Sequence, residues 1–360
     1  MKLLEPAKLG ELYVKNRVFM APLTRSRANN DLAAPTQLHV EYYKQRSSAG
    51  LIISEGVPVS KQAIGYNNIP GIYSHKQVEA WKPVTEIVHK YDGRIFAQLW
   101  HVGRLSHPSY LDGDVPVAPS AVNPNVLIST KSGKARSVTP KALSVDEISQ
   151  TVIDFQNAAI NAMKAGFDGV EIHSSNGYLF HQFFCSTSNL RKDQYGGSIE
   201  NKTRFLFKVL DALKEVMPEH KIGLRLNPMM HDKYGIFVDE ETPETFDYIV
   251  TKLNTYNLAY VHITRPWKMI DSPYFIKDVI GHYRKLYKGF LIANGHYGFE
   301  DAEGEIVANR ADAIAFGRLF ISNPDLPERL ANRWPLTDPD TKTFYTSGAR
   351  GYTDYPKYQV

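Results

Sequence analysis

The sequence has almost no cysteine, with Cys185 alone among 360 residues. A single thiol excludes an internal disulfide and any metal site built from several cysteines. We interpret Cys185 as a small buried hydrophobe rather than a nucleophile. Long apolar runs are also missing. Because a helical span needs roughly 18 or more consecutive apolar residues, the chain predicts no membrane span and no membrane partner.

Charge of one sign is not concentrated anywhere along the chain. There are 42 Lys and Arg residues against 38 Asp and Glu, for a net charge of +4. Such a small, dispersed excess argues against a nucleic-acid partner. Residues 1–6 hold charges and a proline where a signal peptide needs an apolar core. With the lone cysteine, this predicts a cytoplasmic location.

Three common catalytic motifs are absent. No Gly-x-Gly-x-x-Gly sequence occurs, which disfavours a doubly wound dinucleotide-binding sheet. No His-Glu-x-x-His sequence occurs, and we expect no metal site. No Gly-x-Ser-x-Gly nucleophile elbow occurs either. A metal-dependent barrel hydrolase and a serine hydrolase are therefore weak alternatives.

Short β-rich runs alternate with segments of helical period, in a composition of 43% apolar and 22% charged residues that is typical of globular proteins. Length alone would allow two domains, but α/β barrels reach this length as one. We predict an α/β fold, a single (β/α)₈ TIM barrel over residues 1–360. The expected strands are residues 17–23, 50–55, 94–100, 168–173, 221–227, 259–264, 290–294 and 313–316.

The clearest helix is expected at residues 145–165. Ser144 and Glu147 form a capping box at its start, and Gly166 stands where a terminating glycine belongs. Two further helices are expected at 199–216 and 243–254, opened by Ser198 and Thr242. Residues 102–143 are rich in proline, and we expect them to form a long excursion after strand three over the barrel mouth.

Active sites of such barrels lie at the carboxyl ends of the strands, and the last two ends favour an anion site. Gly295 follows strand seven, and Gly317 with Arg318 follows strand eight. Glycine permits close backbone approach, and arginine offers a bidentate fork for phosphate. Alternatively, each glycine only ends its strand and Arg318 is a solvated charge.

Strand five places Arg225 within an apolar run. A buried cation needs a compensating partner. Arg225 either pairs with an internal Asp or Glu, or it faces a cofactor that gains negative charge on reduction.

Strand four ends with three polar residues in a short stretch, His173, Asn176 and Tyr178. The first two can donate hydrogen bonds to one oxygen, as an oxyanion site requires. Tyr178 is protonated at neutral pH and can act as a general acid. A structural histidine and a packing tyrosine are the alternatives.

Together these strand ends resemble the Old Yellow Enzyme family of flavin-dependent ene-reductases, over nearly the whole chain. The matching motifs are residues 16–28, 97–104, 169–173, 193–205, 316–318, 323–327 and 351–356. The resemblance implies noncovalently bound FMN at the barrel mouth and NAD(P)H as hydride donor. It implies reduction of an α,β-unsaturated carbonyl compound, with hydride passing from the flavin to the β-carbon.

The resemblance also implies individual roles. His173 and Asn176 would bind the substrate carbonyl, and Tyr178 would protonate the α-carbon. Thr24 would bond near the flavin C4 carbonyl, Gln98 would contact the pyrimidine edge, and Arg225 would lie by N1 and O2. The remaining cofactor-binding residues implied are Pro22, Leu23, Gly56, Asn294, Gly295, Gly317 and Arg318, of which Gly295, Gly317 and Arg318 hold the phosphate. Many relatives have alanine at the position of Gly56, and we expect this difference to change little.

The substrate pocket is expected to include Tyr66, Trp100 and Tyr352, although each can also be simple packing. Residues 265–275 match no family motif. The same site could reduce nitroesters or nitroaromatic compounds, whose oxygens suit the same donors. A non-catalytic flavin-binding redox sensor is the alternative of another class, which the Tyr178 acid argues against. We expect small-molecule partners and a monomer or homodimer.

Overall fold

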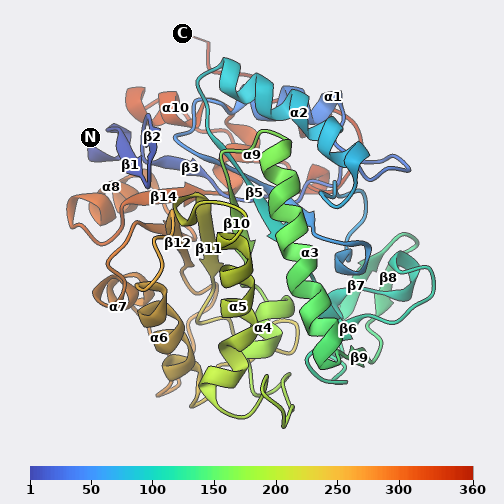
Figure 1. The fold of residues 1–360 in the computed structure, drawn as a ribbon. Coiled ribbons are helices and arrows are strands. Elements are labelled where there is room, and N and C mark those ends of the chain that lie inside the picture. The colour runs from blue at the N-terminus through green and yellow to red at the C-terminus, as the bar shows by residue number, and fades with distance from the viewer. Residues whose placement is uncertain (360) are drawn as a thin grey trace.

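In the computed structural model, which describes residues 1–359, eight parallel strands close into a barrel (Figure 1). Their order around the barrel follows the chain, and the last strand pairs with the first. The strands are β3 (Val18–Met20), β4 (Ile52–Pro58), β5 (Ile95–Trp100), β10 (Gly169–His173), β11 (Ile222–Leu226), β12 (Tyr260–Thr264), β13 (Leu291–Asn294) and β14 (Ala313–Phe316). The predicted barrel is confirmed, and each expected strand is present with slightly different ends.

The strands are buried on both faces, which explains their nearly continuous apolar sequences. Alternate residues such as Phe19, Ile53 and Ile292 point into one inner cluster, while their neighbours pack against the surrounding helices. An N-terminal antiparallel hairpin of β1 (Ala7–Leu9) and β2 (Leu12–Val14) adds its apolar side chains to the inner cluster. The barrel interior is therefore filled and supports the site at its other end.

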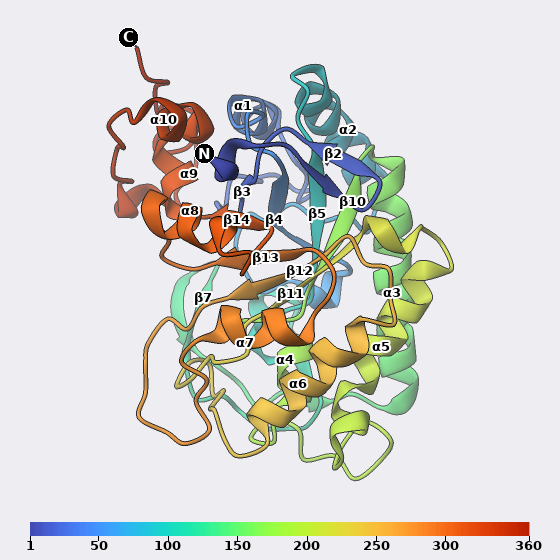
Figure 2. The same ribbon diagram turned by 90° about the vertical axis from the view of Figure 1, so that its left-hand side faces the viewer.

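Helices surround the strands, as Figure 2 shows from the side. They are α1 (Gln37–Gln45), α2 (His75–Lys90), α3 (Val145–Lys164), α4 (Leu179–Phe184), α5 (Ile199–Lys214), α6 (Thr242–Leu253), α7 (Val279–Leu286), α8 (Phe299–Val307), α9 (Arg318–Ser322) and α10 (Leu326–Asn332). Short 3₁₀ turns lie at Lys2–Leu4, Lys61–Ala63, Gly103–Leu105, Pro108–Tyr110, Glu219–Lys221 and Thr341–Thr343. Within the described residues, none of the helices is long and apolar enough to cross a membrane.

The capping signals place the helix starts closely. The backbone N–H of Glu147 donates to Ser144 Oγ over 3.1 Å, and the Glu147 carboxylate accepts from the Ser144 N–H over 2.8 Å. Ser198 likewise caps α5. The expectation for α6 was wrong by one residue, because Thr242 is inside the helix rather than its cap. Its hydroxyl instead donates to Asp239 Oδ1 over 2.6 Å.

Residues 102–143 contain two small β pairs and two of the 3₁₀ turns. The pairs are β6 (Val117–Ala118) with β9 (Lys141–Ala142), and the hairpin of β7 (Leu127–Thr130) and β8 (Gly133–Arg136). Leu105, Ile128 and Lys134 from this excursion line a cavity beside the carboxyl ends of the barrel strands.

Candidate active site

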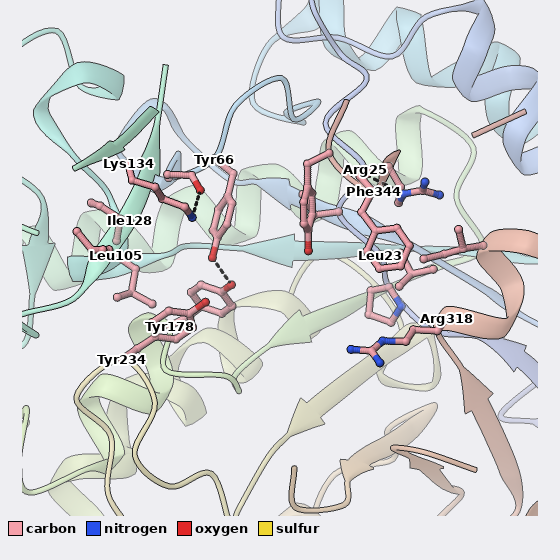
Figure 3. Close-up of a pocket in the computed structure, with 17 residues that line it drawn as sticks. Leu23, Arg25, Tyr66, Leu105, Ile128, Lys134, Tyr178, Tyr234, Arg318 and Phe344 are labelled. Atoms are coloured by element: carbon pink, nitrogen blue, oxygen red, sulfur yellow. Dashed lines mark hydrogen bonds between the residues drawn. The ribbon is translucent and has the colours of Figure 1, made fainter. Parts of the chain in front are cut away.

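Two adjoining cavities lie at the carboxyl ends of the strands and share Pro22, Leu23 and Arg318. The first, of about 460 Å³, includes Tyr66 and Tyr178, and we call it the tyrosine cavity (Figure 3). The second, of about 530 Å³, is lined by the strand-end glycines, and we call it the glycine cavity. Thr24 lines the tyrosine cavity. The shared residues make one continuous site from the ends of β3 and β14.

His173 is the last residue of β10 and is only 5% exposed. Its Nδ1 lies 3.0 Å from Ser175 Oγ. Burial, followed by the nearby charge of Arg225, holds the imidazole pKa well below its usual value. The ring is therefore neutral at physiological pH. When Ser175 donates to Nδ1, the ring proton sits on Nε2, which becomes a hydrogen-bond donor.

Asn176 adopts a left-handed backbone conformation, with φ of 58°, and Gly177 follows with φ of 78°. Asparagine tolerates this region better than most residues. The amide nitrogen of Asn227 donates to Asn176 Oδ1 over 2.9 Å. Because the oxygen is engaged in this way, the side-chain NH₂ of Asn176 is left as the donor. Sequence patterns gave no indication of Ser175 and Asn227 as partners.

Tyr178 immediately precedes α4, and its hydroxyl lies 3.0 Å from that of Tyr66 (Figure 3). Burial is the main reason that its pKa is raised above the ordinary tyrosine value. The phenol therefore remains protonated over the whole physiological range. Its ring makes an edge contact with that of His173, with centroids 4.9 Å apart. Of the three polar residues expected at the end of strand four, His173 and Tyr178 are therefore in contact.

Trp100 closes β5 and packs between Tyr66 and His173, with ring centroids 5.1 and 5.9 Å away. Its indole lies directly over Gly56. A Cβ at Gly56 would stand 2.4 Å from Trp100 Cε3. The indole therefore occupies the space that a methyl group at this position needs, which argues against the expectation that alanine changes little.

The structure does not place Tyr352 in the pocket. It is completely buried, and its ring stacks on Tyr42 with centroids 4.0 Å apart. It lines neither cavity, and packing is the correct interpretation. Phe344 and Tyr345 of the same C-terminal region line the tyrosine cavity instead.

Two buried arginines hold that C-terminal region in place. Arg25 donates to the carbonyl of Phe344 over 3.1 Å, and Arg27 donates to the carbonyls of Thr343 and Arg350, each over 2.9 Å. Both arginines lie in the segment that follows β3. Arg25 lines the tyrosine cavity, and through these hydrogen bonds both arginines also fix the C-terminal part of the cavity wall.

Arg225 lines the glycine cavity from β11. Its Nη2 donates to Asn294 Oδ1 over 3.0 Å and approaches Thr264 Oγ1 at 3.4 Å. Among the described residues, no carboxylate lies within salt-bridge distance of it. The alternative of a direct internal ion pair is therefore wrong. Asn294 also donates to the carbonyl of Ala315 over 2.7 Å, so its amide holds Arg225 across two strands.

A buried polar ladder lies beside Arg225. Gln98 Nε2 donates to Glu171 Oε1 over 2.8 Å, and the other carboxylate oxygen is 2.8 Å from His262 Nδ1. All of these side chains are at most 2% exposed. Glu171 fixes which way the Gln98 amide points, and its charge favours the cationic form of Arg225. Sequence reasoning missed Glu171 and His262, which sit within apolar-looking strands.

The end of the glycine cavity is rich in unused donors. Gly295 and His296 follow β13, Gly317 is the N-cap of α9, and Arg318 is the first residue of that helix. Within residues 1–359, the backbone N–H groups of these four residues donate to no protein acceptor, and the Arg318 guanidinium has no hydrogen-bond partner. Free amides and a free guanidinium beside glycines fit an anion.

The described residues offer neither a metal site nor a reactive thiol. No three His, Cys, Asp or Glu side chains of the described residues gather as a metal site. Cys185 is buried, and burial raises the pKa of its thiol to about 12. A thiol in this state is a poor nucleophile.

The chain is similar to flavin enzymes over almost its full length. Residues 2–337 match the NADH:flavin oxidoreductase / NADH oxidase family. The sequence is 39% identical to flavin oxidoreductase hxnT of Emericella nidulans, covering 98% of this chain and 97% of that protein. It is 40% identical to 12-oxophytodienoate reductase 1 of Oryza sativa subsp. japonica, covering 98% and 92%.

Solved structures are similar to this chain in both fold and sequence. An old yellow enzyme homologue from Zymomonas mobilis superposes with a TM-score of 0.94 at 40% identity, covering 99% of this chain and 100% of that one. Morphinone reductase superposes with a TM-score of 0.93 at 43% identity, covering 99% and 96%.

Proposed function

The chain belongs to the NADH:flavin oxidoreductase / NADH oxidase family, as an Old Yellow Enzyme, and from this premise we propose how its residues share the work of the reaction. It is an FMN-dependent NAD(P)H oxidoreductase that reduces activated alkenes. When bound, the flavin supplies the hydride that it has received from NAD(P)H. The protein residues bind, orient and protonate.

The two adjoining cavities suit FMN. We assign the phosphate to the amides of Gly295 and Gly317 and to the guanidinium of Arg318, because these donors have no partner within residues 1–359. Arg225, held by Asn294, would face the ring edge that becomes negative on reduction. Glu171 accepts from the amide nitrogen of Gln98, so the side-chain carbonyl oxygen of Gln98 is the group that would face the cofactor.

The rest of the expected ring contacts come from two strands. Pro22 and Leu23 line both cavities and Thr24 lines the tyrosine cavity, where its Oγ1 has no hydrogen-bond partner among residues 1–359. Gly56 lies behind Trp100 and faces Gln98 in the sheet register.

The substrate carbonyl is held by two donors, His173 Nε2–H and the side-chain NH₂ of Asn176. Ser175 contacts Nδ1 of His173, which leaves the Nε2–H for the substrate. Asn227 donates to Oδ1 of Asn176, which leaves the NH₂ group of Asn176 for the substrate. As hydride reaches the β-carbon, negative charge develops on the carbonyl oxygen. Preoriented donors stabilise this charge most in a buried site. Losing one such donor costs on the order of 10²–10³ in rate in oxyanion holes.

Tyr178 gives its proton to the α-carbon, which completes the reduction of the double bond. Its raised pKa keeps the proton in place until the enolate forms. Tyr66, whose hydroxyl is 3.0 Å away, can relay a proton from solvent, giving its own proton to Tyr178 and taking one from water. The observation that carries the proposal is this protonated, buried phenol beside a neutral histidine donor.

The specific substrate, nitro compounds as further acceptors, the number of subunits and a cytoplasmic location stay predictions. A redox sensor without turnover has no use for an acid beside the carbonyl donors, so the Tyr178 site favours the enzyme.

An anaerobic visible spectrum tests the proposal. Flavin absorbance should bleach with NADPH and return with cyclohexenone. In Tyr178→Phe, bleaching should be unchanged while the return slows about 10²-fold or more, as expected for a lost general acid. The solvent-exposed Tyr13→Phe serves as the matched control and should behave as the wild type. An unchanged rate of return in Tyr178→Phe would contradict the proton-donor role.

A further inference from the structure

Arg265 makes an unusual set of contacts with the segment after β13. Its backbone N–H donates to the carbonyl of Asn294 over 2.8 Å. Its Nε donates to the carbonyl of Gly295 over 2.8 Å, and its Nη2 donates to that of His296 over 3.0 Å. One residue therefore binds three successive carbonyl oxygens. The guanidinium also lies 3.7 Å from the centroid of the Tyr297 ring.

These contacts require an irregular backbone. In an extended strand, successive carbonyls point in opposite directions, so the neighbouring carbonyls of Gly295 and His296 could not both reach one guanidinium. Here Gly295 has φ of 111° and His296 has φ of 53°, and both values lie in the left-handed region. A non-glycine residue adopts that conformation only when its surroundings hold it there. The Arg265 guanidinium provides that restraint.

The restraint has a consequence for the opposite face of the segment. With the carbonyls of Gly295 and His296 bound to Arg265, the amides of these residues have no acceptor among residues 1–359. Gly295 and His296 both line the glycine cavity. Successive backbone N–H groups in such conformations form a concave anion-binding nest.

We propose that Arg265 is a positioning residue, which holds the Gly295–His296 segment as a nest for the phosphate of the cofactor. The proposal rests on the assignment of that phosphate to the glycine cavity beside Arg318. Arg265 acts on the anion through the backbone that it orders. The forked geometry is essential, because Nε and Nη2 reach two carbonyls at once, whereas the single ammonium of lysine has no such fork.

The experiment compares FMN with riboflavin, which has the same ring system but lacks the phosphate. Apoprotein is titrated with each, and binding is followed by quenching of flavin fluorescence. Arg265→Ala should weaken FMN binding roughly tenfold or more, by analogy with the loss of a partner that orients a metal ligand. Riboflavin binding should be unchanged. Arg265→Lys should behave like Arg265→Ala.

Two further variants serve as controls. Lys268→Ala removes the same charge from the same loop at an exposed side chain, and it should leave both titrations unchanged. Arg318→Ala should weaken FMN but not riboflavin. Circular dichroism of each apoprotein shows whether the variants fold.

Each of the remaining outcomes would overturn either the role of Arg265 or the assignment of the phosphate to the glycine cavity. Equal weakening of FMN and riboflavin by Arg265→Ala would overturn the proposal in favour of general damage to the loop. Full recovery in Arg265→Lys would overturn it in favour of long-range charge. If Arg318→Ala discriminates between the ligands and Arg265→Ala does not, the role of Arg265 alone is wrong. If neither variant discriminates between FMN and riboflavin, the phosphate lies outside the glycine cavity.

Discussion

Replacing Gly56 with alanine adds one methyl group in the space that the Trp100 indole occupies. The new Cβ would lie 2.4 Å from Trp100 Cε3 and 2.8 Å from Cδ2. Carbon atoms in proteins pack at about 3.5–4.0 Å, so the indole must move by roughly 1 Å or more. It cannot do so alone, because Tyr66 and His173 pack on it.

The cost follows from this displacement. Over-packing a filled core with one extra carbon typically costs about 1–3 kcal/mol. Trp100 also makes an edge contact with Tyr178, with centroids 4.9 Å apart, so the movement is passed to the catalytic phenol. We therefore expect Gly56→Ala to lower both the free energy of unfolding and the rate of alkene reduction, with flavin reduction by NADPH less affected.

A double-mutant cycle with Trp100→Leu isolates the clash. Leucine removes the ring atoms that Cβ would meet. Chemical unfolding of the wild type, both single variants and the double variant gives the coupling free energy. We expect Gly56→Ala to be destabilising beside Trp100 and nearly neutral beside leucine. Additive effects of the two substitutions would refute the reasoning, since they would show that the methyl group and the indole do not compete for space.

Three further predictions concern the polar groups. Ser175→Ala removes the hydroxyl that contacts His173 Nδ1 and should slow alkene reduction about tenfold in stopped flow, as expected for the loss of an orienting partner. An unchanged rate would show that Ser175 does not set the tautomer of His173. Glu171→Gln removes the negative charge nearest to Arg225 and should raise the midpoint potential of the bound flavin, measured by dye equilibration, whereas a fall would contradict this role. Because the pKa of His173 is lowered and that of Tyr178 raised, neither titrates between about pH 6 and 8. The alkene half-reaction should be flat in that range, with loss of rate only at high pH, where Tyr178 loses its proton; a break near pH 6.5 would contradict a neutral buried histidine.

Much of the fold was predictable because its signals are local. Runs buried on both faces, the Ser144 and Glu147 capping box, and the alternation of strands with helices all depend on residues close together in the chain. The ends of parallel strands also converge in any closed barrel. For this reason His173, Asn176, Tyr178 and Arg225 could be grouped from their positions alone.

The wrong placement of Tyr352 in the substrate pocket has a different origin. Tyr352 and Tyr345 are close in sequence and are both aromatic, yet only Tyr345 lines the cavity, because Arg25 and Arg27 fix how the C-terminal region folds back. No local pattern distinguishes them.

The sequence therefore predicted the barrel and the strand ends that form the site, and its resemblance to a known family predicted the flavin chemistry. The tertiary structure alone decided the partners of these residues: Trp100 over Gly56, Ser175 on His173, Glu171 on Gln98 and Arg265 on the Gly295 segment. Hydrophobic period and motif spacing report short-range order. Packing space and hydrogen-bond direction depend on which distant segments meet, and they exist only once the barrel has closed.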